Sequence, residues 1–76
     1  MKKLDLHRTR HSEVRNKTIR FVEHNWDSGK DAEIITGNSS KMKALVMIVL
    51  DEYGLTYRIG RKLDLNNKGY IVVNFE

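Results

Sequence analysis

The stretch Leu4-Asp5-Leu6-His7, near the start of the chain, gives the clearest indication of the fold. Two branched apolar residues alternate with a carboxylate and an imidazole, and side chains along a β-strand alternate between its two faces. In a strand over residues 3–7, the two leucines therefore point to one face and Asp5 and His7 to the other. The pattern predicts a strand that packs on a core through one face and carries an acid and a base on the other.

Helix and strand patterns alternate along the rest of the chain. Apolar residues recur at helical spacing over residues 12–26 and again over residues 41–53. The chain has no proline, and it shows no internal repeat or linker, so we expect a single domain over residues 1–76. Short runs rich in β-branched and aromatic residues predict three further strands, at 32–35, 55–59 and 70–75.

Start and stop signals flank both predicted helices. Ser12 or Thr9 is the expected N-cap of the first helix, and Ser39 or Ser40 that of the second. Glycines at 29 and 54 are expected to end the helices. Residues 66–69 have the composition of a turn, and we expect the two strands that flank them to pair antiparallel. The predicted buried residues are Val14, Thr18, Phe21, Val22 and Trp26 in the first helix and Met42, Leu45, Val46, Val49 and Tyr53 in the second.

The order βαβαββ predicts the fold class. Strands separated by helices favour a sheet whose first three strands are parallel, with right-handed crossovers. If both crossovers step the same way, both helices cover one face of a four-stranded mixed sheet and the other face stays open. The expected fold is thus an α/β two-layer sandwich, with Leu4 and Leu6 toward the helices and Asp5 and His7 toward the open side.

Positive charge is concentrated in the first part of the chain. The net charge is +4, and residues 1–30 hold eight Lys or Arg against four Asp or Glu, whereas residues 31–76 hold six of each sign. A basic excess favours polyanionic partners such as RNA, DNA or an acidic membrane surface. The alternative is a solubilising surface with no specific partner.

Other features of the composition exclude several classes of protein. The chain has no cysteine, which excludes disulfides and thiolate chemistry and fits a cytoplasmic location. No apolar run reaches the ~20 residues of a membrane span, so we expect no membrane partner. The start Met1-Lys2-Lys3 runs directly into the first predicted strand, and we expect no signal peptide.

The loop at residues 36–40 is the second place where chemistry is predicted. In a parallel arrangement the first two strands end at the same edge, where open α/β sheets bind ligands. Free N–H groups and the dipole at a helix start attract anions, and Gly37 permits close backbone approach. Lys41 and Lys43 oppose that dipole unless an anion binds between them. The alternative is an ordinary cap and turn.

These two motifs, in this order, resemble those of the Smr (small MutS-related) domain family. Leu4-Asp5-Leu6-His7 is similar to the family's LDLH-like motif on its first strand. Thr36-Gly37-Asn38-Ser39 is similar to the TGxG or HGxG motif after its second strand, with Ser39 where the family usually has its second glycine. The resemblance covers residues 4–75. It implies a sheet in the order 1-2-4-3, as in the C-terminal domain of the third bacterial translation initiation factor. It also implies nucleic-acid cleavage, including nicking of DNA and cutting of mRNA at stalled ribosomes.

The resemblance implies that Asp5 and His7 are the catalytic residues. An imidazole gives or takes a proton near neutral pH, and Asp5 would orient it, hold a metal or activate the nucleophile. The alternative is a structural polar pair at a strand end. The predicted nucleic-acid-binding residues are basic and polar groups of the two loops: Arg8, Arg10, His11, Thr36, Gly37, Asn38, Ser39, Ser40, Lys41 and Lys43.

Three functions follow for testing. The first is a small endonuclease that cleaves RNA or DNA. The second, favoured by Ser39, is a non-catalytic module that binds nucleic acid or the ribosome, and the third is a protein-interaction module. The spacing of His7, His11 and His24 predicts no zinc site. A divalent metal cofactor and the oligomeric state stay open.

Overall fold

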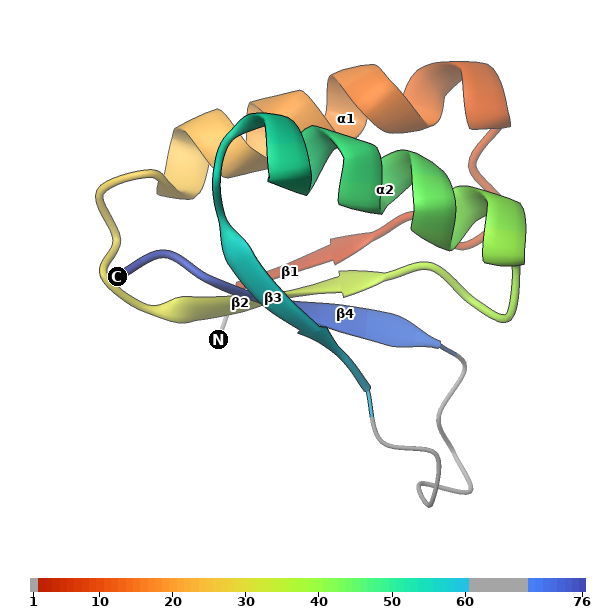
Figure 1. Ribbon diagram of the computed structural model, residues 1–76. Coiled ribbons are helices and arrows are strands. Elements are labelled where there is room, and N and C mark those ends of the chain that lie inside the picture. The colour runs from red at the N-terminus through yellow and green to blue at the C-terminus, as the bar shows by residue number, and fades with distance from the viewer. Residues whose placement is uncertain (1, 61–68) are drawn as a thin grey trace.

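Two helices lie on one face of a four-stranded sheet (Figure 1). The structure is a computed structural model, and it describes residues 2–60 and 69–76. The predicted order βαβαββ is confirmed. The elements are β1 (Lys2–Asp5), α1 (His11–Asn25), β2 (Asp31–Ile35), α2 (Ser40–Glu52), β3 (Thr56–Ile59) and β4 (Tyr70–Asn74).

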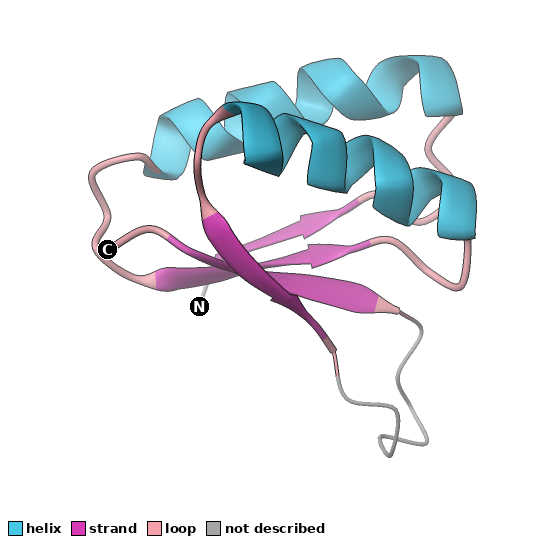
Figure 2. Ribbon diagram, viewed as in Figure 1, coloured by secondary structure: helices cyan, strands magenta, loops and turns pink. Residues whose placement is uncertain are grey.

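The sheet is mixed, with the strand order β1-β2-β4-β3. β1 pairs parallel with β2, and β4 pairs antiparallel with both β2 and β3. The first three strands therefore run in one direction, as predicted, although β4 lies between β2 and β3. Figure 2 shows both helices as one layer above the sheet, which leaves the opposite sheet face open. The strand order is the one that the resemblance to the Smr family implies.

The core lies between the helices and the inner face of the sheet. Alternate residues of the two central strands point into it: Ala32 and Ile34 of β2, and Ile71 and Val73 of β4, are at most 1% exposed. From the helices, the buried residues include Val14, Val22, Val46, Val49 and Leu50. Leu6, just beyond β1, is fully buried as well, and Leu4 packs against the same cluster. Both leucines of the opening motif thus face the core, as predicted.

The start of α2 follows its predicted capping. The side-chain oxygen of Ser39 accepts a hydrogen bond from the Met42 N–H at 3.1 Å, so Ser39 is the N-cap. At the other end, Gly54 has a φ of 67° and its N–H donates to the Asp51 carbonyl at 3.0 Å. Of the predicted turn at residues 66–69, only Gly69 lies within the described residues.

Three predictions about α1 and β1 are wrong. β1 ends at Asp5 rather than His7, because the chain turns there. Arg10, not Ser12 or Thr9, is the N-cap of α1, and its side chain makes no capping bond. Trp26 is 47% exposed instead of buried, because α1 ends one residue earlier and Asn25 faces the core. The Trp26 ring packs on Tyr53, with the ring centres 5.7 Å apart.

Candidate functional site

The ends of β1 and β2 bring the two motifs together. Beyond the last paired residues, Asp5 and Ile35, the Leu6 N–H donates to the Ile35 carbonyl at 2.8 Å. The turn that follows Leu6 and the loop that begins at Thr36 therefore lie side by side at one edge of the sheet, where Figure 1 shows both connections to the helices. The prediction that both motifs share this edge is confirmed.

The turn after β1 is held by two hydrogen bonds. The Asp5 carboxylate accepts the His7 N–H at 2.9 Å, and the Leu6 carbonyl accepts the Thr9 N–H at 2.9 Å. The second bond closes a four-residue turn whose third residue, Arg8, has a φ of 67°. Glycine or asparagine usually fills this position, and a left-handed conformation costs another residue about 1–2 kcal/mol. Strain of this kind concentrates at functional sites.

This geometry changes the predicted roles of Asp5 and His7. Because β1 ends at Asp5, strand alternation does not extend to His7, and it no longer determines which way the His7 side chain points. The Asp5 carboxylate binds the main chain of His7. Within residues 2–60 and 69–76, no hydrogen bond reaches the His7 imidazole. Asp5 therefore positions the turn, and the side chains of His7 and Arg8 are exposed beside it.

The loop after β2 is tied to the start of β4. The backbone N–H groups of Thr36 and Gly37 both donate to the Gly69 carbonyl, at 3.0 and 3.1 Å. The Thr36 hydroxyl is 3.3 Å from the same carbonyl and 3.1 Å from that of Gly37, and Thr36 is only 2% exposed. The expectation that the N–H groups of this loop are free for an anion is thus wrong for these two residues, because the protein itself supplies their acceptor.

The first turn of α2 offers further N–H groups to a ligand. Ser40 and Lys41 are its first two residues, and a helix has no internal acceptor for its first N–H groups. The next N–H, that of Met42, is bound by the Ser39 cap. The positive end of the helix dipole therefore projects two donors, beside the turn that carries His7.

Gly69 is the residue of this region that sequence reasoning missed. Its φ is 83°, and a Cβ added to it would overlap the backbone carbonyl of Gly37. It would also lie 3.1 Å from the Lys43 side chain. Glycine is thus required at 69 both by the backbone conformation and by the close approach of the Gly37 loop. The only signal was the turn composition of residues 66–69.

The remaining predicted residues divide by exposure. Thr36 and Gly37 are buried, and Ser39 and Lys43 are half-buried. Within the described part of the chain, no group of three or more His, Asp or Glu side chains is arranged to hold a metal ion. Over the same residues, neither helix has the length and apolarity to cross a membrane. The exposed members of the predicted binding set are Arg8, Arg10, His11, Asn38, Ser40 and Lys41.

Comparison of the chain with protein-family models, with curated proteins and with solved structures finds no match. The resemblance to the Smr family therefore rests on the two motifs, their spacing and the order of the elements.

Proposed function

We propose that the chain is a small endonuclease of the Smr type that binds nucleic acid and cuts phosphodiester bonds at the turn after β1. The observation that carries the proposal is the turn itself. Asp5 holds the His7 N–H, Arg8 has a left-handed conformation, and these two consecutive residues of the turn are both exposed, one with an imidazole and one with a guanidinium. That pair supplies the two things that the reaction requires, a proton acceptor and a positive charge.

RNA is the substrate that needs least from the protein. Its 2′-hydroxyl is an internal nucleophile, so cleavage requires that a base removes one proton and that charge on the phosphate is stabilised. In the proposed mechanism His7 takes the 2′-hydroxyl proton, and the 2′-oxygen attacks phosphorus while the bond to the 5′-oxygen breaks. The products are a 2′,3′-cyclic phosphate and a 5′-hydroxyl, whose oxygen takes its proton from water. Arg8 neutralises the phosphate oxygens in the transition state. The exposed N–H groups of Ser40 and Lys41 hold the neighbouring phosphate.

Asp5 acts in this mechanism as a positioning residue. Its carboxylate accepts the His7 N–H, and it thereby fixes the direction in which the turn presents His7. An asparagine keeps an acceptor oxygen in the same place, whereas an alanine removes it. We therefore expect Asp5→Asn to cut faster than Asp5→Ala, a difference that a direct proton-transfer role for the carboxylate would not produce.

Single-turnover cleavage of end-labelled RNA and DNA of one sequence, with and without magnesium, tests the proposal. We expect the wild-type chain to cut RNA, and His7→Ala to lower the rate by about 10²–10⁴-fold, the usual contribution of a general base. Arg58→Gln is the control, since Arg58 lies on β3 and outside the site. Equal rates for the wild type and His7→Ala would show that His7 is not the base.

A second function is favoured by the loop after β2. Because the N–H groups of Thr36 and Gly37 are bound to the Gly69 carbonyl, the loop cannot use them to hold a phosphate. Ser39 is the N-cap of α2 and stands where the Smr motif usually has a glycine. A cytoplasmic module that binds RNA or the ribosome without cutting is therefore the alternative. It predicts salt-dependent binding with no cleavage under any metal condition.

A further inference from the structure

Most of the basic residues of the first thirty have no acidic partner. Lys3 pairs with Glu33 at 3.7 Å, and Arg15 pairs with Glu52 at 2.8 Å. The other six form no ion pair within residues 2–60 and 69–76, so their charge is available to a ligand. They are Lys2, Arg8, Arg10, Lys17, Arg20 and Lys30.

Two of these residues line a hollow between α1 and β1. Lys17, Arg20 and His24 recur at three- and four-residue intervals and so lie on one side of α1. Together with Leu4 and Phe21 they line a shallow, open hollow of about 340 Å³. Since Arg15 pairs with Glu52 of α2, this row lies on the other side of α1, which borders the edge strand β1.

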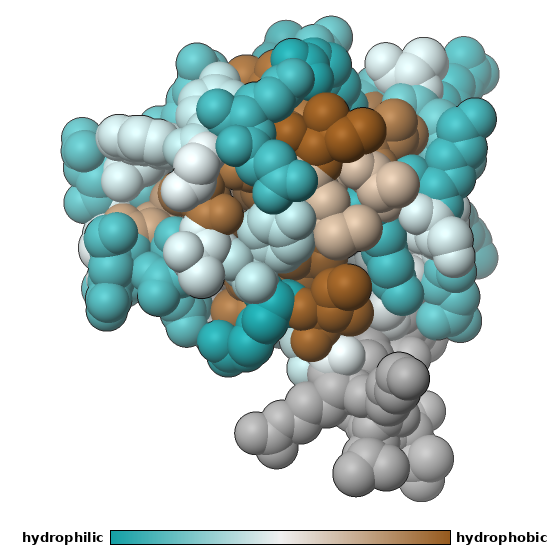
Figure 3. Space-filling model, viewed as in Figure 1, coloured by the Kyte–Doolittle hydropathy of each residue, from teal (hydrophilic) through white to brown (hydrophobic). Residues whose placement is uncertain are grey.

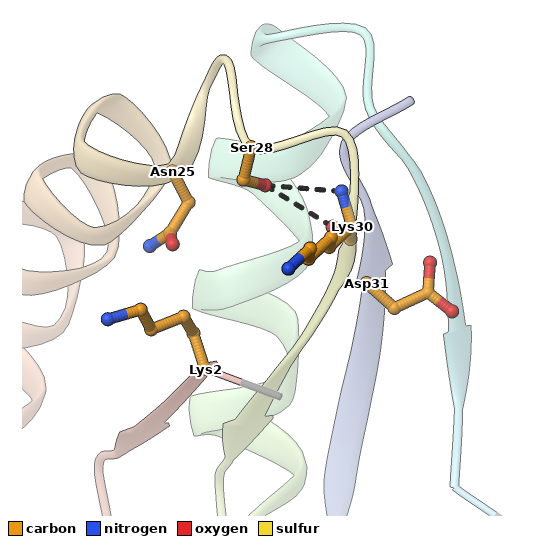
Figure 4. Close-up of a pocket in the computed structure, with 5 residues that line it drawn as sticks. All are labelled: Lys2, Asn25, Ser28, Lys30 and Asp31. Atoms are coloured by element: carbon orange, nitrogen blue, oxygen red, sulfur yellow. Dashed lines mark hydrogen bonds between the residues drawn. The ribbon is translucent and has the colours of Figure 1, made fainter.

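A second hollow continues the first at the start of β1. It has a volume of about 550 Å³ and is lined by Lys2, Asn25, Ser28, Lys30 and Asp31. Figure 4 shows the side chains of Lys2, Asn25 and Lys30 turned toward one space, whereas the Asp31 carboxylate points away from both ammonium groups.

The two hollows share the same two elements: Lys2 and Leu4 lie two positions apart on β1, and His24 and Asn25 are consecutive on α1, so the hollows are adjacent. We call them together the α1–β1 trough.

Two other surfaces of the described residues carry less unpaired positive charge. On the open sheet face, Lys3, Glu33, Val72 and Arg58 stand in one row of paired residues, and the acids Asp5 and Asp31 lie on the same strands as members of this row. The side over α2 and β3 carries exposed apolar groups, visible as brown areas in Figure 3, and Ile48 and Ile59 are 51% and 53% exposed. The trough is the surface that fits a polyanion.

We propose that the α1–β1 trough binds the phosphate backbone of single-stranded RNA and leads the strand to the turn at His7. This proposal rests on the proposed function and names how its substrate is held. Lys2 and Lys30 lie at one end of the trough, Lys17 and Arg20 line its middle, and Arg8 and Arg10 lie beyond its other end, where β1 meets the turn. The unpaired cations thus follow one path.

The shape of the trough selects a single strand over a duplex. Its walls are one helix and one strand, and Leu4 and Phe21 provide an apolar surface between the cations, suited to the faces of unpaired bases. α1 has 15 residues, which gives a length of about 22 Å at 1.5 Å per residue. A stacked strand with one phosphate per 3.4 Å places about six nucleotides along that length.

The test compares two double variants that lose the same charge. K17Q/R20Q removes two cations from the trough, and R15Q/R58Q removes two from elsewhere. Binding of a fluorescein-labelled twelve-nucleotide oligouridylate is followed by anisotropy between 50 and 200 mM KCl. We expect K17Q/R20Q to raise the Kd about tenfold at low salt and to reduce the salt slope by about 1.4, two phosphate contacts at about 0.7 each. The R15Q/R58Q variant keeps the wild-type slope.

Several outcomes overturn the inference. It is wrong if both double variants weaken binding equally, if K17Q/R20Q binds like the wild type, or if the wild type does not bind the oligonucleotide. It is also wrong if polyglutamate competes as strongly as RNA, because the trough would then recognise an acidic peptide.

Cleavage assays separate the two proposals. Loss of cutting in His7→Ala with wild-type binding in K17Q/R20Q refutes the trough alone. Trough-dependent binding without any cutting refutes the endonuclease alone.

Discussion

Replacement of Gly69 by alanine tests the contact that joins the loop after β2 to the start of β4. The N–H groups of Thr36 and Gly37 donate to the Gly69 carbonyl at 3.0 and 3.1 Å, and a Cβ at position 69 would overlap the Gly37 carbonyl. The substitution therefore forces the two segments apart. We expect it to lower the free energy of unfolding and to displace the loop that borders His7.

The size of the effect follows from these contacts. Each of the two backbone hydrogen bonds contributes about 0.5–1.5 kcal/mol net, so their loss costs about 1–3 kcal/mol. The φ of 83° at Gly69 adds a strain of about 1–2 kcal/mol for alanine. The sum, about 2–5 kcal/mol, is a large part of the stability of a 76-residue domain, which is about 4–11 kcal/mol.

Gly29→Ala and Gly54→Ala are matched controls, because these glycines have φ values of 65° and 67° but nothing within 4 Å of an added Cβ. Urea titrations followed by the fluorescence of Trp26, the single tryptophan, give the free energies of unfolding. If Gly69→Ala is unfolded in buffer, the titration is repeated in sodium sulfate, which stabilises folded chains. Equal losses in Gly69→Ala and Gly29→Ala would refute the close approach, since strain alone would then explain both.

Three further predictions use the same titration. Thr18 is fully buried, and its hydroxyl has no hydrogen-bond partner among the described residues. Thr18→Val should therefore raise the free energy of unfolding by about 1–2 kcal/mol. A lower free energy of unfolding in this variant would show that the hydroxyl is bonded. Arg8→Gly should raise the free energy of unfolding by about 0.5–1 kcal/mol, because the left-handed strain disappears, and should lower the cleavage rate, because the guanidinium is lost. A lower free energy of unfolding in this variant would contradict the strained turn. The Tyr57 hydroxyl donates a hydrogen bond to the Asp51 carboxylate, and this bond, together with burial, raises the pKa of Tyr57 above 10.0. As the pH rises, the Tyr57 hydroxyl therefore loses its proton at a lower pH in the unfolded chain than in the folded one. The stability advantage of the wild type over Tyr57→Phe should therefore be present below pH 10 and decline as the pH rises through the folded pKa, and a constant difference would exclude the link.

Periodic patterns predicted most of the fold. The apolar spacing over residues 41–53 and the cap at Ser39 correspond to α2 at Ser40–Glu52 with its observed capping bond, because both signals are local. The inward direction of Leu4 and Leu6 follows from strand alternation and is confirmed by their burial. The meeting of the two motifs at one edge follows from the parallel pairing of β1 and β2.

The details of the site depend on contacts that no local pattern records. A left-handed residue is usually predicted from glycine or asparagine, so the conformation of Arg8 could not be recognised in the sequence. That turn is what ends strand alternation before His7. The acceptor for the Thr36 and Gly37 N–H groups is Gly69, 33 residues beyond Thr36 along the chain, and only the folded sheet brings it there.

Chemical rescue of a His7→Gly variant tests the proposed chemistry most directly. The variant removes the imidazole and leaves the backbone N–H that Asp5 accepts. The single-turnover rate of RNA cleavage is measured while free imidazole is added. If His7 transfers the proton, the variant is nearly inactive alone and its rate rises with the concentration of imidazole base. A variant that cuts at the wild-type rate without imidazole, or an inactive one that imidazole does not restore, contradicts the account.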